Sequence, residues 1–213
     1  MRPAGVFVVF EGGDGVGKTT QVERLCRRLA AADREVLRTF EPGDSPVGGR
    51  IRSIVLDPAT GDLAPRAEAL LYAADKAQHL YAVVRPALER GAVVVCDRYV
   101  DSMLAYQGAG RVLEVAEVEQ VARWATEDLQ PQLTVLLDVD PRQAVQVKAE
   151  HDRLEAAGAS FHDRARAYFL DLADRDPGRY LVLAARRDRD ELAEEVWRRV
   201  QPLLSDPSGR LPS

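Results

Sequence analysis

One stretch of the chain has the residue types and spacing of a phosphate-binding loop. Gly12 is followed after four residues by Gly17, and then by Lys18 and Thr19. Glycines let backbone N–H groups converge on an anion, and a helix that starts directly after them adds the positive end of its dipole. A lysine here reaches nucleotide β- and γ-phosphates, and the next hydroxyl can ligate Mg²⁺. The pattern predicts a nucleotide-phosphate site with a magnesium ion.

A second set of candidate residues follows a buried apolar run. Residues 92–96 read Ala-Val-Val-Val-Cys, and Asp97 and Arg98 come directly after them. An aspartate at the end of such a strand suits a magnesium-shell or water-orienting role. An adjacent arginine can hold a phosphate through two parallel hydrogen bonds. A structural ion pair at a strand end is the alternative, and we favour the functional interpretation.

A third loop, residues 40–46, reads Phe-Glu-Pro-Gly-Asp-Ser-Pro and follows a predicted strand. Loops after parallel strands gather at the carboxyl edge of the sheet, where ligands bind. This loop is therefore expected to face the phosphate site. A plain turn is an equally good interpretation of these residues by themselves.

The hydrophobic pattern predicts the parallel sheet that would bring these loops together. Strands are expected at residues 6–10, 34–39, 92–96, 133–138 and 180–183. Helices are expected after Thr20, at residues 47–56, 65–90, 114–129, 161–173 and 190–204, and from Pro141 onward. Pro86 is expected to kink or divide the long helix, and His79 to lie on a helix face or the surface. The alternation predicts an α/β fold, a parallel sheet with helices on both faces.

Composition narrows the class of partner and compartment. The net charge of −5 argues against a general nucleic-acid binder, and no apolar run approaches the roughly 20 residues of a membrane span. The two cysteines, Cys26 and Cys96, have no metal-ligand spacing, which favours a reduced, cytoplasmic setting. Residues 1–204 are expected to form one domain, and residues 205–213 a polar tail.

Three motifs together resemble the bacterial type of the thymidylate (dTMP) kinase family. They are EGGDGVGKTTQ, EPGDSPVGGRIRSIVLD and DRYVDSMLAYQGAGR, and the similarity continues through LTVLLDVDP and HDRLE over nearly the whole chain. The resemblance implies a P-loop kinase fold with a five-stranded parallel sheet and a short lid at about residues 145–157. It also implies Mg²⁺-assisted transfer of the ATP γ-phosphoryl group to dTMP, giving dTDP for dTTP biosynthesis, and a homodimer.

The resemblance also implies roles for individual residues. The catalytic residues would be Lys18, Asp14, Arg98 and Arg153, with Arg153 as the lid arginine that closes over the transferring phosphoryl group. ATP would be held by Gly12, Gly13, Asp14, Gly15, Val16, Gly17, Lys18, Thr19 and Thr20, and the metal by Thr19 and Asp97. The dTMP site would comprise Asp14, Glu41, Pro42, Arg52, Tyr72, Lys76, Arg98, Ser102, Met103, Tyr106 and Gln107.

Within the dTMP site, Tyr72 would stack on the base in place of the usual phenylalanine, and Tyr106 would lie under the deoxyribose. The chain departs from the family pattern mainly around the base: Lys76 replaces an arginine, and Met103 replaces a small polar residue. Phe40 also stands where the family usually has arginine, and the lid holds few basic residues. Two alternatives therefore stay open: a kinase for another nucleoside monophosphate, and a catalytically weak, regulatory nucleotide-binding domain.

Overall fold

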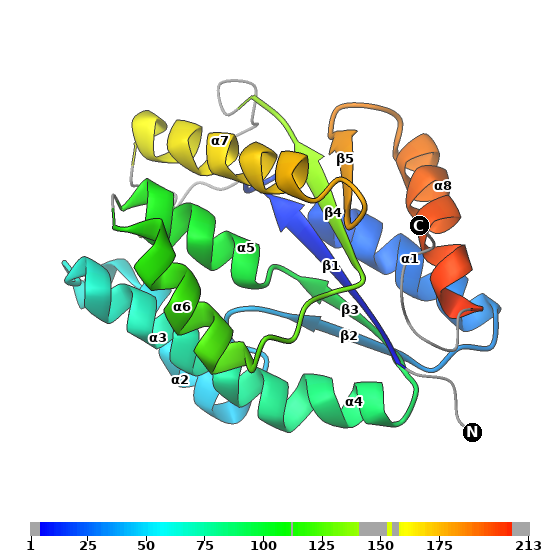
Figure 1. The fold of residues 1–213 in the computed structure, drawn as a ribbon, viewed down its shortest axis with the longest axis horizontal. Helices are drawn as coiled ribbons and strands as arrows, with labels where there is room; N and C mark the ends of the chain where they lie inside the picture. Colours follow the sequence, from blue (N-terminus) through cyan, green and yellow to red (C-terminus); the bar gives the residue numbers. More distant parts are fainter. Residues whose placement is uncertain (1–4, 112, 141–152, 155–157, 206–213) are drawn as a thin grey trace.

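A computed structural model describes residues 5–111, 113–140, 153–154 and 158–205. Its centre is a parallel sheet of five strands in the order β2-β3-β1-β4-β5 (Figure 1). The strands are β1 (Val6–Gly12), β2 (Val36–Phe40), β3 (Val93–Asp97), β4 (Leu133–Asp138) and β5 (Tyr180–Ala184). The predicted strands are therefore confirmed to within two residues at either end. The chain runs from β1 to one edge of the sheet and later to the other, which places the carboxyl end of β1 at the switch point.

Helices cover both faces of the sheet, as the sequence predicted. They are α1 (Lys18–Ala31), α2 (Pro46–Leu56), α3 (Pro65–His79), α4 (Arg85–Glu89), α5 (Val100–Met103), α6 (Val115–Thr126), α7 (Ala159–Arg175) and α8 (Arg189–Val200). Figure 1 shows α1 and α8 together on one side of the sheet, and α3 to α7 on the other. The predicted helix after Pro141 lies outside the described residues.

Alternating side chains of β1 explain the two layers. Val8 and Phe10 pack among residues of α1 and α8, whereas Phe7 and Val9 pack against Leu80 and its neighbours. All seven residues of β1 are buried. Side chains of a strand alternate between the two faces, so a strand covered on both faces is apolar throughout. Glu11 is the one charged residue of β1, and its contacts in the candidate active site explain why it is buried.

The long helix predicted for residues 65–90 is divided. After α3 the chain forms a π-helical turn at Leu80–Val84, and α4 then begins with Pro86 in its first turn. Proline has no N–H, and its ring would collide with the carbonyl group four residues earlier in a regular helix. A wider turn before Pro86 removes that conflict. A second π-helical segment, Leu104–Gly110, follows α5.

Gly12 ends β1 in a conformation and a position that a larger residue cannot share. Its φ is +127°, and a Cβ atom would lie 2.3 Å from the carbonyl oxygen of Leu137 in β4. Gly12→Ala should therefore lower the free energy of unfolding by about 3 kcal/mol, through backbone strain and collision together. Gly17→Ala is the matched control, because Gly17 has a φ of +102° but no described atom within 4 Å of the added Cβ.

Urea unfolding of the nucleotide-free protein measures both changes. The control should lose about 1 kcal/mol, from strain alone. Equal losses for the two variants would contradict the role given to the β1–β4 contact.

Candidate active site

The phosphate-binding loop joins β1 to α1 at the switch point of the sheet. Gly15 and Gly17 have positive φ angles, so the loop uses conformations that glycine allows. The ammonium group of Lys18 turns back over the loop and donates to the carbonyl oxygens of Gly12 and Gly13, at 3.1 and 2.6 Å. Lys18 is buried, and its charge lies where an anion bound by the loop would be.

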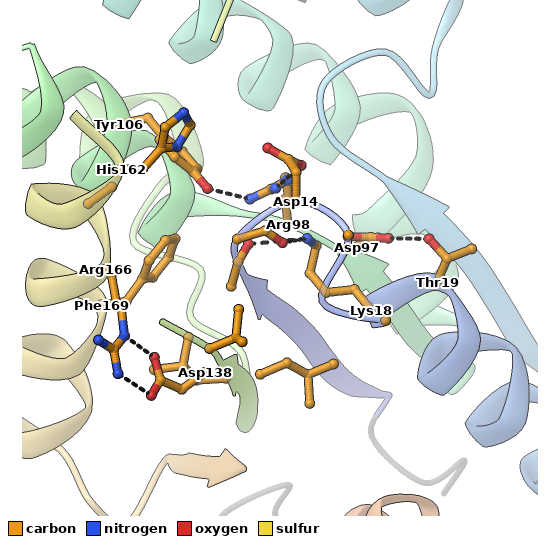
Figure 2. A pocket seen from close by; sticks show the side chains of 18 of the residues that line it. Asp14, Lys18, Thr19, Asp97, Arg98, Tyr106, Asp138, His162, Arg166 and Phe169 are labelled. Carbon is orange, nitrogen blue, oxygen red and sulfur yellow. Dashed lines mark hydrogen bonds and ion pairs between the residues drawn. The ribbon is translucent and has the colours of Figure 1, made fainter. Parts of the chain in front are cut away.

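Two hard oxygen donors lie beside this loop. The hydroxyl group of Thr19 donates to Oδ2 of Asp97 at 3.2 Å, across from α1 to the end of β3 (Figure 2). A hydroxyl and a carboxylate oxygen are ligands that Mg²⁺ accepts, with phosphate oxygens and water completing its shell. Among the described residues no group of three or more His, Cys, Asp or Glu side chains could hold a metal. The oxygens of Thr19 and Asp97 could bind a magnesium ion whose remaining ligands are nucleotide phosphate oxygens and water.

Arg98 connects the phosphate loop to the opposite wall of the site. Its guanidinium donates to Oδ1 of Asp14 at 2.6 Å (Figure 2) and to the hydroxyl of Ser102 at 3.0 Å. It also lies over the ring of Tyr106. The φ of Arg98 is +72°, a left-handed conformation that is costly for a residue with a Cβ. The backbone N–H of Arg98, bonded to the carbonyl of Phe10 at 2.9 Å, helps to hold this conformation.

The charges at this junction change the pKa values of its groups. Burial alone would raise the pKa of Asp14, but Arg98 and then Lys18 lower it to about 2. Asp14 is therefore an anion at neutral pH, and it holds Arg98 at the mouth of the loop.

Glu11 helps to position Arg98 through Ser102, a role that the sequence analysis missed. Its fully buried carboxylate accepts from the backbone N–H groups of Tyr99 and Ser102, at 2.8 and 3.2 Å, and from the Ser102 hydroxyl at 2.6 Å. Because that hydroxyl also accepts from Arg98, a continuous set of hydrogen bonds runs from Glu11 to Asp14. The signal was a charged residue inside a strand that is otherwise apolar.

A small pocket lies on the far side of Arg98 and contains the whole predicted dTMP site. Its volume is about 110 Å³. The lining residues are Asp14, Glu41, Pro42, Arg52, Leu56, Tyr72, Lys76, Arg98, Ser102, Met103, Tyr106, Gln107 and Leu154. The structure therefore brings together all the residues that the resemblance assigned to dTMP, although they come from distant parts of the chain. Their individual roles stay predictions. We call this cavity the acceptor pocket.

The acceptor pocket adjoins a larger cavity of about 1200 Å³ that the phosphate loop lines. The two share Asp14, Glu41, Arg52, Arg98 and Tyr106. Glycines of the loop, Lys18, Thr19, Thr20 and Asp97 line the larger one, which we call the donor cavity. One surface could therefore hold two phosphorylated ligands end to end, with Arg98 between them.

The donor cavity also has a wall that the sequence analysis missed. His162, Arg166 and Phe169 of α7 line it, together with Asp138 at the end of β4 (Figure 2). Arg166 holds Asp138 through two hydrogen bonds of 2.7 and 2.9 Å. The sequence offered only helical periodicity here, because which face of α7 meets the cavity depends on its docking against the sheet.

Arg153, the predicted lid arginine, contacts α2, α3 and the segment between them. Its guanidinium donates to the carbonyl oxygens of Gly61 and Val55, at 2.9 and 3.0 Å, and to the carboxylate of Glu68 at 3.2 Å. The carboxylate is fully buried in α3, and burial of a charge is costly unless cations compensate it. Arg153 and Arg111 compensate this carboxylate. Arg153 is therefore an ion-pair partner of Glu68 in this structure, and its role at the transferring phosphoryl group stays a prediction. The rest of the predicted lid, apart from Leu154, lies outside the described residues.

His79 lies on α3, one of the two places that the sequence predicted for it, but not at the surface. It is fully buried, and its Nδ1 lies 2.7 Å from Oε1 of Glu41. Lys76 donates to the other carboxylate oxygen at 2.5 Å. Although burial opposes it, these two partners lower the pKa of Glu41. Lys76 therefore lines the acceptor pocket as the ion-pair partner of Glu41, a pairing that the sequence did not predict.

The pKa of Lys18 carries a testable consequence for nucleotide binding. Burial and, after it, the charge of Arg98 lower the pKa of its ammonium group to about 8, although Asp97, Asp14 and Glu11 oppose the change. The group is therefore charged below pH 8 and loses its proton as the pH rises through 8. A bound triphosphate favours the charged form, so ATP, the expected ligand, should bind with uptake of about one proton at pH 9 and far less at pH 7.

Calorimetric titrations in two buffers of different ionisation enthalpy measure that uptake. Lys18→Arg should remove it, because arginine stays charged at both pH values. Equal proton uptake by the two proteins at pH 9 would assign the proton to another group.

Comparison with known proteins agrees with this geometry. The sequence model of the family described as "Thymidylate kinase" matches residues 10–196. The chain belongs to the thymidylate kinase family. This confirms the resemblance and the P-loop kinase fold that it implied.

Similar proteins span nearly the same length. A thymidylate kinase of Cutibacterium acnes is 59% identical over 201 residues, which are 94% of this chain and 98% of the relative. One of Deinococcus radiodurans is 52% identical, over 91% of this chain and 95% of the relative. The crystal structure of a thymidylate kinase from Ehrlichia chaffeensis superposes with a TM-score of 0.78 at 27% identity, covering 93% of this chain and all of that one.

Proposed function

We propose that the protein is an ATP-dependent nucleoside monophosphate kinase that converts dTMP into dTDP. One observation carries the proposal: the donor cavity and the acceptor pocket meet at Arg98 and Asp14. Transfer of a phosphoryl group between two nucleotides requires such an arrangement, in which two phosphate ends are held in line. Family membership and the names of its similar relatives support the same reaction.

In this reaction the residues position phosphates and balance charge. The loop N–H groups and Lys18 would hold the phosphates of ATP, and Arg98 would hold the acceptor phosphate where it now holds Asp14. Thr19 and Asp97 would hold Mg²⁺, which neutralises phosphate charge when bound. Tyr72, Met103 and Gln107 would enclose the base, since all three are buried around the acceptor pocket.

An assay of ADP release with ATP and Mg²⁺ tests the proposal across a panel of nucleoside monophosphates. Turnover with dTMP should exceed turnover with dUMP, dCMP, dGMP and UMP at least about tenfold, since enclosed polar groups discriminate strongly. A different best acceptor would replace dTMP in the proposal. Absence of turnover with every acceptor, while ATP still binds, would favour the regulatory alternative.

We also propose a homodimer formed by the outer face of α3. Leu70, Ala74 and Ala77 of α3 and Tyr81 of the π-helical turn after it follow one another at helical spacing, and Leu70 and Tyr81 are 58% and 78% exposed. Trp124 on α6, a helix that packs beside α3, is 83% exposed. Exposed large apolar side chains on adjacent helices are typical of a surface that a partner covers.

Leu70→Glu should therefore convert a dimer into a monomer in sedimentation experiments, because it would bury an unpaired carboxylate in the contact. Val182→Glu is the control, since Val182 is 45% exposed on β5 at an edge of the sheet. A monomeric wild-type protein, or a dimeric Leu70→Glu variant, would contradict this interface.

A reduced, cytoplasmic setting is also proposed. Cys26 and Cys96 are both free, and Cys96 is buried in β3. None of the described helices is both long enough and apolar enough to cross a membrane.

A further inference from the structure

A row of polar contacts runs from the acceptor pocket into the loop that follows β2. Lys76 contacts Glu41, and Glu41 contacts Nδ1 of His79. The second ring nitrogen, Nε2, lies 2.6 Å from the hydroxyl oxygen of Thr39, which in turn lies 2.6 Å from Oδ2 of Asp44. We call these five residues the polar row. It links α3 to the loop through side chains, and four of the five are buried.

Counting protons along the polar row gives an unexpected result. Between Glu41 and Asp44 there are three short contacts, and each needs one hydrogen atom. Ionised carboxylates supply none, the Thr39 hydroxyl supplies one, and a neutral imidazole supplies one. One further proton is therefore required. Without it, Nε2 or the carboxylate oxygen of Asp44 would face a lone pair of Thr39 at 2.6 Å.

The positions of the charges indicate where that proton resides. Glu41 is held as an anion by Lys76, so it accepts from His79. Imidazole is a stronger base than a carboxylate, which favours His79 over Asp44 as the carrier. We propose that His79 is doubly protonated, with one N–H donated to Glu41 and the other to Thr39, and that it is a positioning residue for Lys76 and Glu41 at the acceptor base.

Other titratable groups also face the polar row. Asp75 of α3 accepts from the backbone N–H of Gly43, and its second oxygen has no hydrogen-bond partner among the described residues. Its pKa is raised to about 6, first by burial and then by Glu41. Cys96 of β3 and Tyr99 are close and uncharged at neutral pH, since burial raises the pKa of each. Asp75 therefore adds a negative charge beside the polar row above pH 6.

The doubly protonated ring has a consequence for the acceptor pocket. The ring donates to one carboxylate oxygen of Glu41, and the other oxygen then accepts from Lys76 and fixes its position. The ammonium group of Lys76 keeps two further N–H groups that can donate to a ligand. If the ring lost a proton, either the contact with Glu41 or the tie to Thr39 and Asp44 would break. This part of the inference rests on the proposed function, whereas the protonation state does not.

Nitrogen-15 NMR of histidine-labelled protein tests the protonation state without any assay of activity. The chain has three histidines, so His151→Gln and His162→Gln assign the signals of His79 by elimination. At pH 8 both ring nitrogens of His79 should show a one-bond coupling to hydrogen. A single protonated nitrogen in the wild-type protein would overturn the proposal, and the extra proton would then belong to Asp44 or be absent.

Asp44→Asn removes the distal charge while keeping the size of the side chain. At pH 8 it should leave His79 with one proton, because the amide of the introduced asparagine can donate to Thr39 and the Thr39 hydroxyl then donates to Nε2. Asp62→Asn is the control, because Asp62 is exposed and its removal changes net charge equally. His79→Leu removes the N–H donated to Glu41, and it should raise KM for dTMP about tenfold with kcat changed less than about twofold, as expected for one lost hydrogen bond to a charged group. An unchanged KM would overturn the positioning role. A wild-type protein with the doubly protonated ring but no dTMP turnover would contradict the proposed function instead.

Discussion

Replacing Lys18 with alanine should lower kcat/KM for phosphoryl transfer about a thousandfold, or about 4 kcal/mol of transition-state stabilisation. The ammonium group is buried over the loop and bonded to two carbonyl oxygens. Those carbonyls hold it where transferring charge would develop, and burial strengthens its electrostatic interactions. Steady-state kinetics with saturating dTMP measure the loss.

Lys18→Arg separates charge from position. Arginine keeps the charge, but its planar fork cannot replace a compact ammonium group that bonds Gly12 and Gly13 from within the loop. We therefore expect this variant to recover nucleotide binding and little of kcat. Near-normal kcat/KM in Lys18→Ala would remove Lys18 from the transfer step.

The second large effect is expected at Arg98. Arg98→Ala should lower kcat/KM about a thousandfold, because the guanidinium lies between the donor cavity and the acceptor pocket and contacts Asp14, Ser102 and the Tyr106 ring. Its loss would leave Asp14 beside the acceptor phosphate without a cation, so two negative charges would repel each other there. The same kinetic assay measures the fall in kcat/KM, with KM for dTMP and kcat determined separately.

Arg98→Lys is the matched control because both substitutions keep a Cβ atom at the left-handed backbone of residue 98, where φ is +72°. Backbone strain is then equal in the two variants, and only the head group differs. Lysine should restore part of the activity because it keeps a positive charge. It cannot donate to Asp14 and Ser102 at the same time in the way that the two guanidinium nitrogens do. Equal activity of the two variants would show that strain, and not the guanidinium, explains the loss.

The sequence predicted the parts of this molecule whose signals are local. The strands, the phosphate loop and the Asp97–Arg98 pair follow from apolar runs and the residues directly after them. Because parallel strands end at one edge, their loops had to converge, and the acceptor pocket contains every residue that the family resemblance assigned to it.

The parts that it missed depend on contacts between distant segments. Glu11, Glu68 and His79 are buried polar groups, and each is stable only with partners that the fold supplies. Arg153 was predicted as the lid arginine, and the sequence did not show that it would pair with the buried carboxylate of Glu68. A motif tells which residue types occur together, but the direction of a long side chain follows from the charges it meets.

The central claim is that one phosphoryl group passes directly from ATP in the donor cavity to dTMP in the acceptor pocket. The most direct test is a single-turnover reaction with ATP labelled in its γ-phosphate, Mg²⁺ and dTMP, followed by separation of the products. The label should appear in the β-phosphate of dTDP, and Arg98→Ala should slow its appearance about a thousandfold. Label released as inorganic phosphate at a rate that dTMP does not change would contradict the account.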